Sequence, residues 1–528
     1  MRSFDRREFI TTSAAAGVGL MTALTASAQR TDLDVEEATI ASLQTAMGKG
    51  VYTAQQLVTR YVTIIASRDK RVTNSIIEIN PDALRIAAQL DRERKAGKLR
   101  GPLHGIPVVL KDNIDTADKM KTTAGSLALL DAPVPKQDAF LVTQLRNAGA
   151  VVLGKTNLSE WANFRSTAST SGWSGRGGQT RNPYILDRNP CGSSSGTGAA
   201  IAANFAAIGI GTETDGSIVC PSSICGIVGI KPTVGLISRS GVIPISASQD
   251  TAGPMTRTVA DAAVMLNVLD AADPSDPATT AAGKRRERVD YTNFLKADGL
   301  KGAVIGVARD YWGKRAEVDK LMDAALDVMK RHGATLVDVK FPGITKFGDA
   351  EFEVLQFEFK DGLEKYLAGR GSRFKTLDDL IRFNNENAAR EMPHFKQEIF
   401  ETSAKKGPLT SKEYRDARAL SLKHTRDDID EAMKKYKLDA IVAPSNAPSW
   451  MTDLVNGDCG SNYISSSSLA AVSGYPAITV PAGFIRELPI GISFFGRPWS
   501  EGDLIKFAYA FEQATKARRK PKFLATVS

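Results

Sequence analysis

AAIGIGTETDGSIVC, residues 206–220, runs from a short apolar segment directly into a loop of glycine and small polar residues. The apolar part has the length and composition of a buried β-strand. Similar runs alternate with helical or glycine-rich stretches between residues 100 and 260. This alternation predicts an α/β fold, with a large mixed, mostly parallel twisted sheet surrounded by helices. The other three runs are IPVVL (106–110), AVVLG (150–154) and ICGIVGI (224–230).

The C-terminal half differs in composition from this glycine-rich core. Residues 271–290 are rich in Pro, Asp and Ala, which predicts an exposed connection. A charged helical stretch follows, and we interpret about 270–435 as a variable cap. Residues 436–528 return to buried strands and end in an amphipathic helix. We therefore expect one domain over residues 29–528, with its core at about 100–260.

The first 28 residues resemble an export signal. Arg6 and Arg7 lead into the modestly apolar stretch FITTSAAAGVGLMTALTA, which ends at Ala26-Ser27-Ala28. Glycine, threonine and serine interrupt this stretch, whereas a membrane anchor needs about 20 strongly apolar residues. The pattern predicts a twin-arginine signal peptide over 1–28, recognised by the twin-arginine export machinery. It also predicts a periplasmic or secreted protein without stable membrane insertion after cleavage.

The overall composition is that of a globular protein, with 42% hydrophobic and 24% charged residues and a net charge of +9. The basic runs KRRER (284–288) and KARRKPK (516–522) are not interleaved with aromatic residues, so we expect no nucleic-acid partner. Four cysteines do not form a disulfide framework or a metal-binding pattern. Buried thiols are the expectation, with one bridge possible, and we expect no cofactor or metal.

Two short motifs suggest other chemistry but lack its structural context. GAVVLGKT (149–156) matches a phosphate-binding loop, yet its Ala, Val, Val and Leu favour a buried strand. GSSSG (192–196) matches the nucleophile elbow of α/β-hydrolases and would make Ser194 the nucleophile. Such an elbow follows a strand directly, whereas YILDRNPC precedes this one. The pattern therefore favours a serine that is activated by a residue other than histidine.

Lys111 is the candidate base, because it ends the apolar run of GIPVVLKDN and can turn its side chain into the core. A lysine takes a proton from serine only when burial or neighbouring charges lower its pKa. Such Ser–Lys pairs are a known variant of the catalytic triad. The structural alternative is a lysine at a strand tip that pairs with Asp112.

Two serines are candidate partners for Lys111. Ser217 follows Gly216 in a loop whose consecutive backbone amides can converge on a developing oxyanion. Ser193 follows Gly192 at the start of an alanine-rich helix, where a serine is commonly only a helix cap. Taken singly, each serine has a structural explanation.

Six ordered segments together resemble the amidase signature family of Ser-Ser-Lys hydrolases. Within that family, GWSGRGGQTRNPY (172–184), TETDGSIVCP and SQDTAGPM (248–255) are most similar to the bacterial peptide amidase branch, which acts on C-terminal carboxamides. The resemblance covers nearly all of residues 29–528 and is faintest from about 270 to 430. The six segments are PLHGIPVVLKDNIDT, TTAGS, GKTNLSEWA, NPCGSSSGTGAA, GTETDGSI and CGIVGIKPTVGLISRSGVIP.

The resemblance implies a role for each reactive position. Lys111 would be the general base, Ser193 the bridging serine with a cis peptide bond, and Ser217 the serine that is acylated. Asp215 stands where many members have glycine, and Ser195 with Thr197 stands where glycine and serine are usual. The oxyanion hole would consist of the backbone amides of Thr214, Asp215, Gly216 and Ser217.

The implied function is an exported amidase that hydrolyses carboxamide bonds through an acyl-enzyme, with C-terminal peptide amides as the candidate substrates. Aryl amides, urethanes and esters remain open as alternatives, as do a noncatalytic binding protein on the same fold and a transamidation subunit. Ser194, Trp173 and Trp450 are candidate substrate-binding residues. The stretch NGDCGSN (456–462) is a further candidate for the pocket lining.

Overall fold

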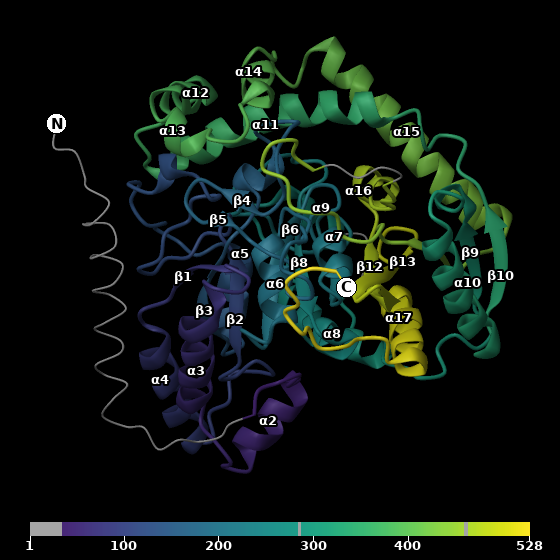
Figure 1. Ribbon diagram of the computed structural model, residues 1–528, viewed down its shortest axis with the longest axis horizontal. Coiled ribbons are helices and arrows are strands. Elements are labelled where there is room, and N and C mark those ends of the chain that lie inside the picture. The colour runs from purple at the N-terminus through teal and green to yellow at the C-terminus, as the bar shows by residue number, and fades with distance from the viewer. Residues whose placement is uncertain (1–33, 284–286, 459–462, 528) are drawn as a thin grey trace.

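The computed structural model describes residues 34–283, 287–458 and 463–527 (Figure 1). The predicted signal peptide lies outside these residues. A single 11-stranded sheet forms the centre, in the order β1-β3-β2-β6-β8-β7-β12-β13-β11-β9-β10. Its strands are β1 (Ile76–Ile79), β2 (Pro107–Lys111), β3 (Val151–Thr156), β6 (Ile208–Glu213), β7 (Val228–Lys231), β8 (Thr251–Thr256), β9 (Val304–Ala308), β10 (Thr335–Val339), β11 (Ala440–Pro444), β12 (Ala477–Ile485) and β13 (Leu488–Phe495). A separate two-stranded sheet joins β4 (Trp173–Ser174) and β5 (Gly178–Gln179).

The large mixed sheet confirms the predicted fold class, and each of the four apolar runs of the core contributes to a strand, although the run 224–230 begins at the last residue of α7 and enters β7 only at Val228. The expectation that the sheet is mostly parallel needs correction. Parallel pairing joins β3, β2 and β6 near one end and β11, β9 and β10 at the other. The strands between them are antiparallel. Apolar runs indicate that a strand is buried but do not indicate its direction, because both directions bury the same side chains.

Helices cover both faces of the sheet, and none within the described ranges is both long and apolar enough to cross a membrane. They are α2 (Ile40–Gly48), α3 (Ala54–Ile64), α4 (Ala83–Lys95), α5 (Phe140–Asn147), α6 (Ser195–Ala202), α7 (Val219–Ile224), α8 (Val259–Leu269), α9 (Pro277–Gly283), α10 (Ala316–Arg331), α11 (Gly348–Arg370), α12 (Leu377–Glu386), α13 (Ala388–Glu391), α14 (Glu398–Ala404), α15 (Lys412–Lys435), α16 (Ser468–Ser473) and α17 (Glu501–Thr515).

Helices α11 to α15, drawn in green along the top and right of Figure 1, form a cap over residues 348–435, whereas β9 and β10 of the predicted cap region of about 270–435 belong to the central sheet. The cap shares a second hydrophobic cluster with Trp161 and Phe164 of the core. A buried ion pair between Arg165 and Glu160 lies beside this cluster, and the Arg165 guanidinium also donates to the carbonyl of Lys396 at 3.2 Å. Buried polar groups of this kind are costly to separate, so the cap is firmly attached to the core.

The connection at 271–290 is only in part the exposed loop that its composition predicts, because exposed residues alternate with buried ones along its described part. Part of it forms α9, and the side chains of Asp273 and Asp276 are almost fully buried. Asp273 accepts a hydrogen bond from the Ser238 hydroxyl, and Asp276 forms an ion pair with Arg239 at 2.6 Å. These polar partners lie more than 30 residues away, and the local composition contains no signal for them.

Candidate active site

Lys111, Ser193 and Ser217 come together at one edge of the sheet. Lys111 ends β2, which pairs in parallel with β6, and Ser217 lies in the loop that leaves β6 for α7. Because neighbouring parallel strands end at the same edge, both residues are carried to one place. Ser193 lies two residues before α6. The Nζ of Lys111 is 2.7 Å from the Oγ of Ser193, which is 3.0 Å from the Oγ of Ser217.

Lys111 is buried without a carboxylate partner in direct contact among the described residues. Its Nζ donates to the carbonyl and hydroxyl of Thr212, at 3.1 and 2.9 Å. Burial lowers the pKa of Lys111 to about 7, although the charges of Asp250 and Glu213 act in the opposite direction. A substantial fraction of this amine is therefore uncharged near neutral pH and can accept a proton.

The structural alternative for Lys111, pairing with Asp112, does not occur. Asp112 instead lies 3.2 Å from the guanidinium of Arg176 and accepts a hydrogen bond from Thr123 at 2.5 Å. Successive residues of a strand point to opposite faces of the sheet. Lys111 and Asp112 therefore serve different sites although they are neighbours in sequence.

The loop between β6 and α7 is held from within. The Glu213 carboxylate accepts hydrogen bonds from the amides of Ile218 and Val219, at 2.7 and 2.9 Å. Gly216 has a φ of +77°, a conformation that glycine adopts without strain. The carbonyl of Ser217 accepts from the amide of Ser194 at 3.2 Å. These contacts fix the backbone at the predicted oxyanion hole of Thr214, Asp215, Gly216 and Ser217, whose role stays a prediction.

A disulfide joins the two serine-bearing segments. Cys191 and Cys220 are bridged, so the expectation of buried thiols fails for this pair and the possible single bridge is present. Cys225 is a buried free thiol, and burial raises its pKa. Cys459 lies outside the described residues. The peptide bond between Gly192 and Ser193 is cis, as the resemblance implies.

A pocket of about 330 Å³ opens beside Ser217, and Gly192, Asp215 and Gly216 form part of its wall. Burial raises the pKa of Asp215, although Ser467 and Ser468 lie beside its carboxyl and lower it. The other lining residues are Asn163, Ser171, Cys191, Cys220, Trp450, Asp458, Tyr463, Ser465, Ser467 and Ser468.

The candidate substrate-binding residues lie in different places in the structure. Trp450 lines the pocket, and so does Asp458 from the predicted stretch 456–462, of which residues 459–462 are outside the described residues. The hydroxyl of Ser194 donates to the carbonyl of Thr212 and accepts from its amide, at 3.1 and 3.2 Å, so it braces β6. Trp173 is buried elsewhere, with the Phe395 ring 5.1 Å from its own.

Two residues of the site escaped the sequence analysis. Thr212 holds Lys111 in place, and its position one residue before the end of β6 is a signal only once β2 and β6 are known to be neighbours. Tyr463 lines the pocket, with its hydroxyl 3.2 Å from the Sγ of Cys220. The candidate stretch 456–462 ends one residue before this tyrosine, so its bounds were drawn one residue too short.

Known proteins resemble this chain in sequence and in overall fold. The family profile described as Amidase matches residues 56–505. The crystal structure of native peptide amidase from Stenotrophomonas maltophilia is 48% identical, with a TM-score of 0.87, covering 92% of this chain and 99% of that one. A probable amidase from Arabidopsis thaliana is 41% identical over 501 residues, which is 93% of this chain and 92% of that protein.

A third relative is part of a different enzyme. One subunit of the glutamyl-tRNA(Gln) amidotransferase from Carboxydothermus hydrogenoformans is 36% identical over 454 residues, covering 83% of this chain and 89% of that protein. The fold, the family profile and these relatives agree, and the chain belongs to the amidase family and is an amidohydrolase.

Proposed function

We propose that this amidohydrolase cleaves carboxamides through an acyl-enzyme on Ser217, with Lys111 as the general base and Ser193 as the proton relay. The observation that carries the proposal is the unbroken chain of short contacts from the buried Lys111 through Ser193 to Ser217. Ser217 keeps 8% of its surface exposed beside the pocket, whereas Ser193 and Lys111 are covered. This order suits a nucleophile that meets the substrate with its base behind it.

The proposed reaction begins when the Oγ of Ser217 attacks the carbonyl carbon. The hydroxyl proton of Ser217 passes to Ser193, which gives its own proton to the uncharged Nζ of Lys111. The oxyanion that forms is stabilised by backbone amides of the loop from Thr214 to Ser217. The carbon–nitrogen bond then breaks, and the relay returns the proton to the leaving nitrogen. Water repeats the sequence on the ester, releases the acid and restores Ser217.

C-terminal peptide amides are the substrates we favour. The supporting observation is the 48% identity to peptide amidase over 92% of this chain. The pocket beside Ser217 also suits a carboxamide, because its wall of serines, Asn163 and Asp458 offers hydrogen-bond acceptors to the amide nitrogen. Aryl amides, urethanes and esters are the alternative substrates.

The decisive experiment measures hydrolysis by the purified protein alone, as ammonia released from primary amides, the aniline released from an anilide and the alcohol released from an ester. The panel contains amidated dipeptides, acetamide, an anilide and an ester, with Ser217→Ala as the control variant. We expect fastest turnover of the dipeptide amides and a loss of at least about 10⁴-fold in kcat in the variant with its folding intact. Normal turnover by Ser217→Ala would refute the assignment of Ser217 as the nucleophile. A lack of hydrolysis of every substrate in the panel by the unmodified protein would favour a binding protein or a subunit that needs partners.

We also propose export by the twin-arginine pathway. The support is the Arg6-Arg7 motif and the Cys191–Cys220 disulfide, since such bridges persist in oxidising compartments. Replacing both arginines with lysine in the full chain should retain the protein and its activity in the cytoplasm of a twin-arginine-competent bacterium. Unchanged fractionation into the periplasm or medium would contradict this route.

A further inference from the structure

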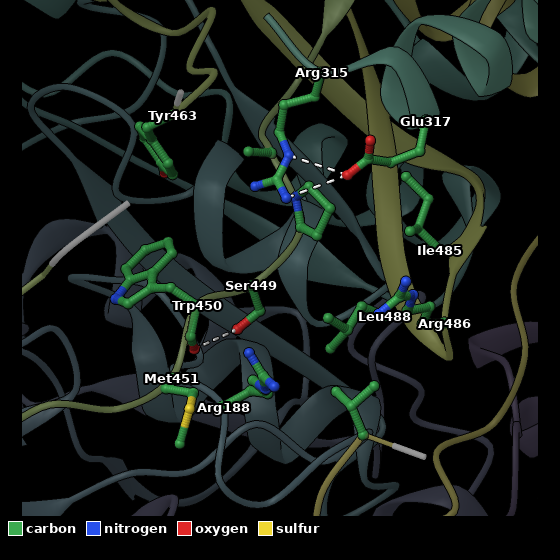
Figure 2. Close-up of a pocket in the computed structure, with 13 residues that line it drawn as sticks. Arg188, Arg315, Glu317, Ser449, Trp450, Met451, Tyr463, Ile485, Arg486 and Leu488 are labelled. Carbon is green, nitrogen blue, oxygen red and sulfur yellow. Dashed lines mark hydrogen bonds and ion pairs between the residues drawn. The ribbon is translucent and has the colours of Figure 1, made fainter. Parts of the chain in front are cut away.

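A second cavity, of about 520 Å³, adjoins the pocket beside Ser217. Trp450 and Tyr463 line both spaces and form the wall between them. Their rings are 5.4 Å apart and nearly perpendicular. Figure 2 shows these two rings on one side of the cavity, with Ile485, Arg486 and Leu488 on the opposite side. A substrate that reaches Ser217 and extends past Trp450 enters this second space.

Three guanidinium groups from distant segments line this cavity, which we call the arginine cavity. Arg188 precedes the Ser193 segment, Arg315 caps the N-terminus of α10, and Arg486 lies in the turn between β12 and β13. Glu317 is the only acidic residue in its described lining. The cavity therefore has a positive charge balance, which favours an anionic ligand.

The one counter-ion in the lining is weakly engaged. Both contacts of Glu317 with the Arg315 guanidinium are 3.2 Å long and end on the same carboxylate oxygen. The side chains are 33% and 47% exposed, for Arg315 and Glu317 respectively, and exposed ion pairs of this kind contribute little free energy. The Nε of Arg188 lies 3.2 Å from the carboxylate of its neighbour Asp187 without forming a hydrogen bond to it. These guanidinium groups can therefore bind a further anion.

The backbone at Arg486 gives a second, independent indication. Arg486 and Glu487 form a two-residue hairpin turn, with φ angles of +47° and +66°. Asparagine and glycine are the usual residues in a turn with two positive φ angles, because other side chains are strained there. An arginine at this position is not explained by the turn, and its side chain lines the cavity.

The two adjoining spaces differ in charge. The pocket beside Ser217 has Asp215 and Asp458 in its wall and no basic residue in its described lining, so it disfavours a carboxylate. The arginine cavity combines guanidiniums with the apolar side chains of Met451 and Leu488. This combination suits a carboxylate on a short hydrocarbon chain, such as the side chain of glutamate.

We propose that the arginine cavity is a substrate subsite that binds the carboxylate of an acidic residue upstream of the amidated C-terminus. The inference rests on the proposed function, since it concerns which peptide amides the same site selects. The carboxylate lies against Arg188, Arg315 and Arg486 while the neutral carboxamide lies beside Ser217. Opposite preferences of the two spaces orient the peptide and disfavour its reversed binding.

The test compares two N-acetylated tripeptide amides that differ only by Glu or Gln at the first residue, and a second pair with the change at the middle residue. In at least one pair we expect a roughly three- to tenfold higher kcat/KM for the Glu peptide at low salt, mainly through KM. High salt should reduce this preference. Equal or lower kcat/KM for Glu in both pairs would overturn the proposal.

Variants with opposite expected signs sharpen the test. Arg315→Gln should bring the Glu-to-Gln ratio towards one, whereas Glu317→Gln should increase it. Arg486→Asn should lower the ratio while leaving Tm unchanged or higher, because asparagine tolerates the positive φ. Arg331→Gln, at the exposed far end of α10, is the matched control and should leave the ratio unchanged. A ratio unaffected by an Arg315→Gln and Arg486→Asn double variant would refute the assignment.

Two readouts separate this inference from the proposed function. Turnover of the Gln peptide by the unmodified protein and its loss in Ser217→Ala test the chemistry alone. Binding of both peptides to Ser217→Ala, measured by calorimetry, tests the subsite without turnover and should favour the Glu peptide. Activation of Gln-peptide turnover by free succinate, without any preference for the Glu peptide, would show an effector site and refute the subsite.

Discussion

The sheet edge around Ser217 and the arginine cavity next to it are assembled in different ways. The reactive groups come from segments between residues 111 and 217, and their contacts run through side chains with almost no exposed surface. The arginine cavity draws on segments from Arg188 to Val527 and keeps an exposed rim. The comparison teaches that the proposed reactive groups are held on and next to adjacent strands, whereas the proposed selectivity would depend on segments that only the complete fold brings together.

Buried lysines show how specific the reactive arrangement is. Lys155 on β3 is as deeply buried as Lys111, and burial lowers the pKa of both. The Nζ of Lys155, however, donates to the carbonyl of Ile114 and the hydroxyl of Thr122. Burial that lowers the pKa of a lysine is therefore not enough, and contact with a serine relay distinguishes Lys111.

The largest effect is expected when the amine of Lys111 is removed and the result is compared with removal of the amine of Lys155. Lys111→Met should lower kcat for a dipeptide amide by about 10³-fold or more, because Ser193 then has no base to receive its proton. Lys155→Met is the matched control. It should lower Tm, and it should lower kcat much less than Lys111→Met does. Steady-state kinetics and thermal unfolding of both variants check this. Comparable loss of kcat in the two folded variants would remove the special role of Lys111.

The second prediction concerns pH. Lys111 must be uncharged to act as a base, and its pKa is about 7 in the folded protein. Below that value protonation removes the active form, so kcat/KM should fall about tenfold per pH unit as pH decreases. A pH profile of kcat/KM with a neutral peptide amide measures this decrease on the acidic side. A flat profile between pH 5.5 and 8 would contradict the assigned base.

The third prediction removes the bridge between the serine-bearing segments. Cys191 and Cys220 are 29 residues apart, and closing such a loop stabilises a folded protein by about 3 kcal/mol. A Cys191→Ala and Cys220→Ala double variant should have a lower Tm and a several-fold lower kcat. Cys225→Ala, which removes a buried free thiol, should change both quantities less. Equal Tm shifts in the two variants would argue against the bridge.

The smallest expected effect distinguishes the two tryptophans. Trp450→Leu should raise KM for peptide amides a few-fold with little change in kcat, because Trp450 lines both substrate spaces. Trp173→Leu should leave KM unchanged and lower Tm, since Trp173 is 5% exposed and its ring lies 5.8 Å from the Arg165 guanidinium. Michaelis kinetics and thermal unfolding separate these outcomes, and a higher KM in Trp173→Leu would reverse the distinction.

Much of the fold could be predicted because short runs of apolar residues indicate buried strands. The runs at 106–110 and 150–154 and the apolar part of 206–220 became strands, whereas only the second half of 224–230 did, because Ile224 ends α7. Strand direction could not be predicted in the same way, and the sheet is antiparallel at its centre. The buried contacts of 271–290 were also missed, because the partners of Asp273 and Asp276 are distant in sequence.

The residues of the candidate site also fall into those that local motifs predicted and those whose places depend on packing. The motifs predicted which lysine and which serines to examine, and the structure brings Lys111, Ser193 and Ser217 into one chain of contacts. Ser194 and Trp173 were equally plausible lining residues by type. Their actual places, against Thr212 and beside Phe395, follow from packing that no local pattern encodes.

The sequence by itself determined which residue types stand at the end of β2 and in the loops before α6 and α7, because motifs and apolar periodicity are properties of short segments. The tertiary structure alone decided that Lys111 is buried beside Ser193 rather than paired with Asp112. It also decided that Arg188, Arg315 and Arg486 share one cavity. Burial and charge balance arise from groups distant along the chain, so they exist only once the sheet has closed around them.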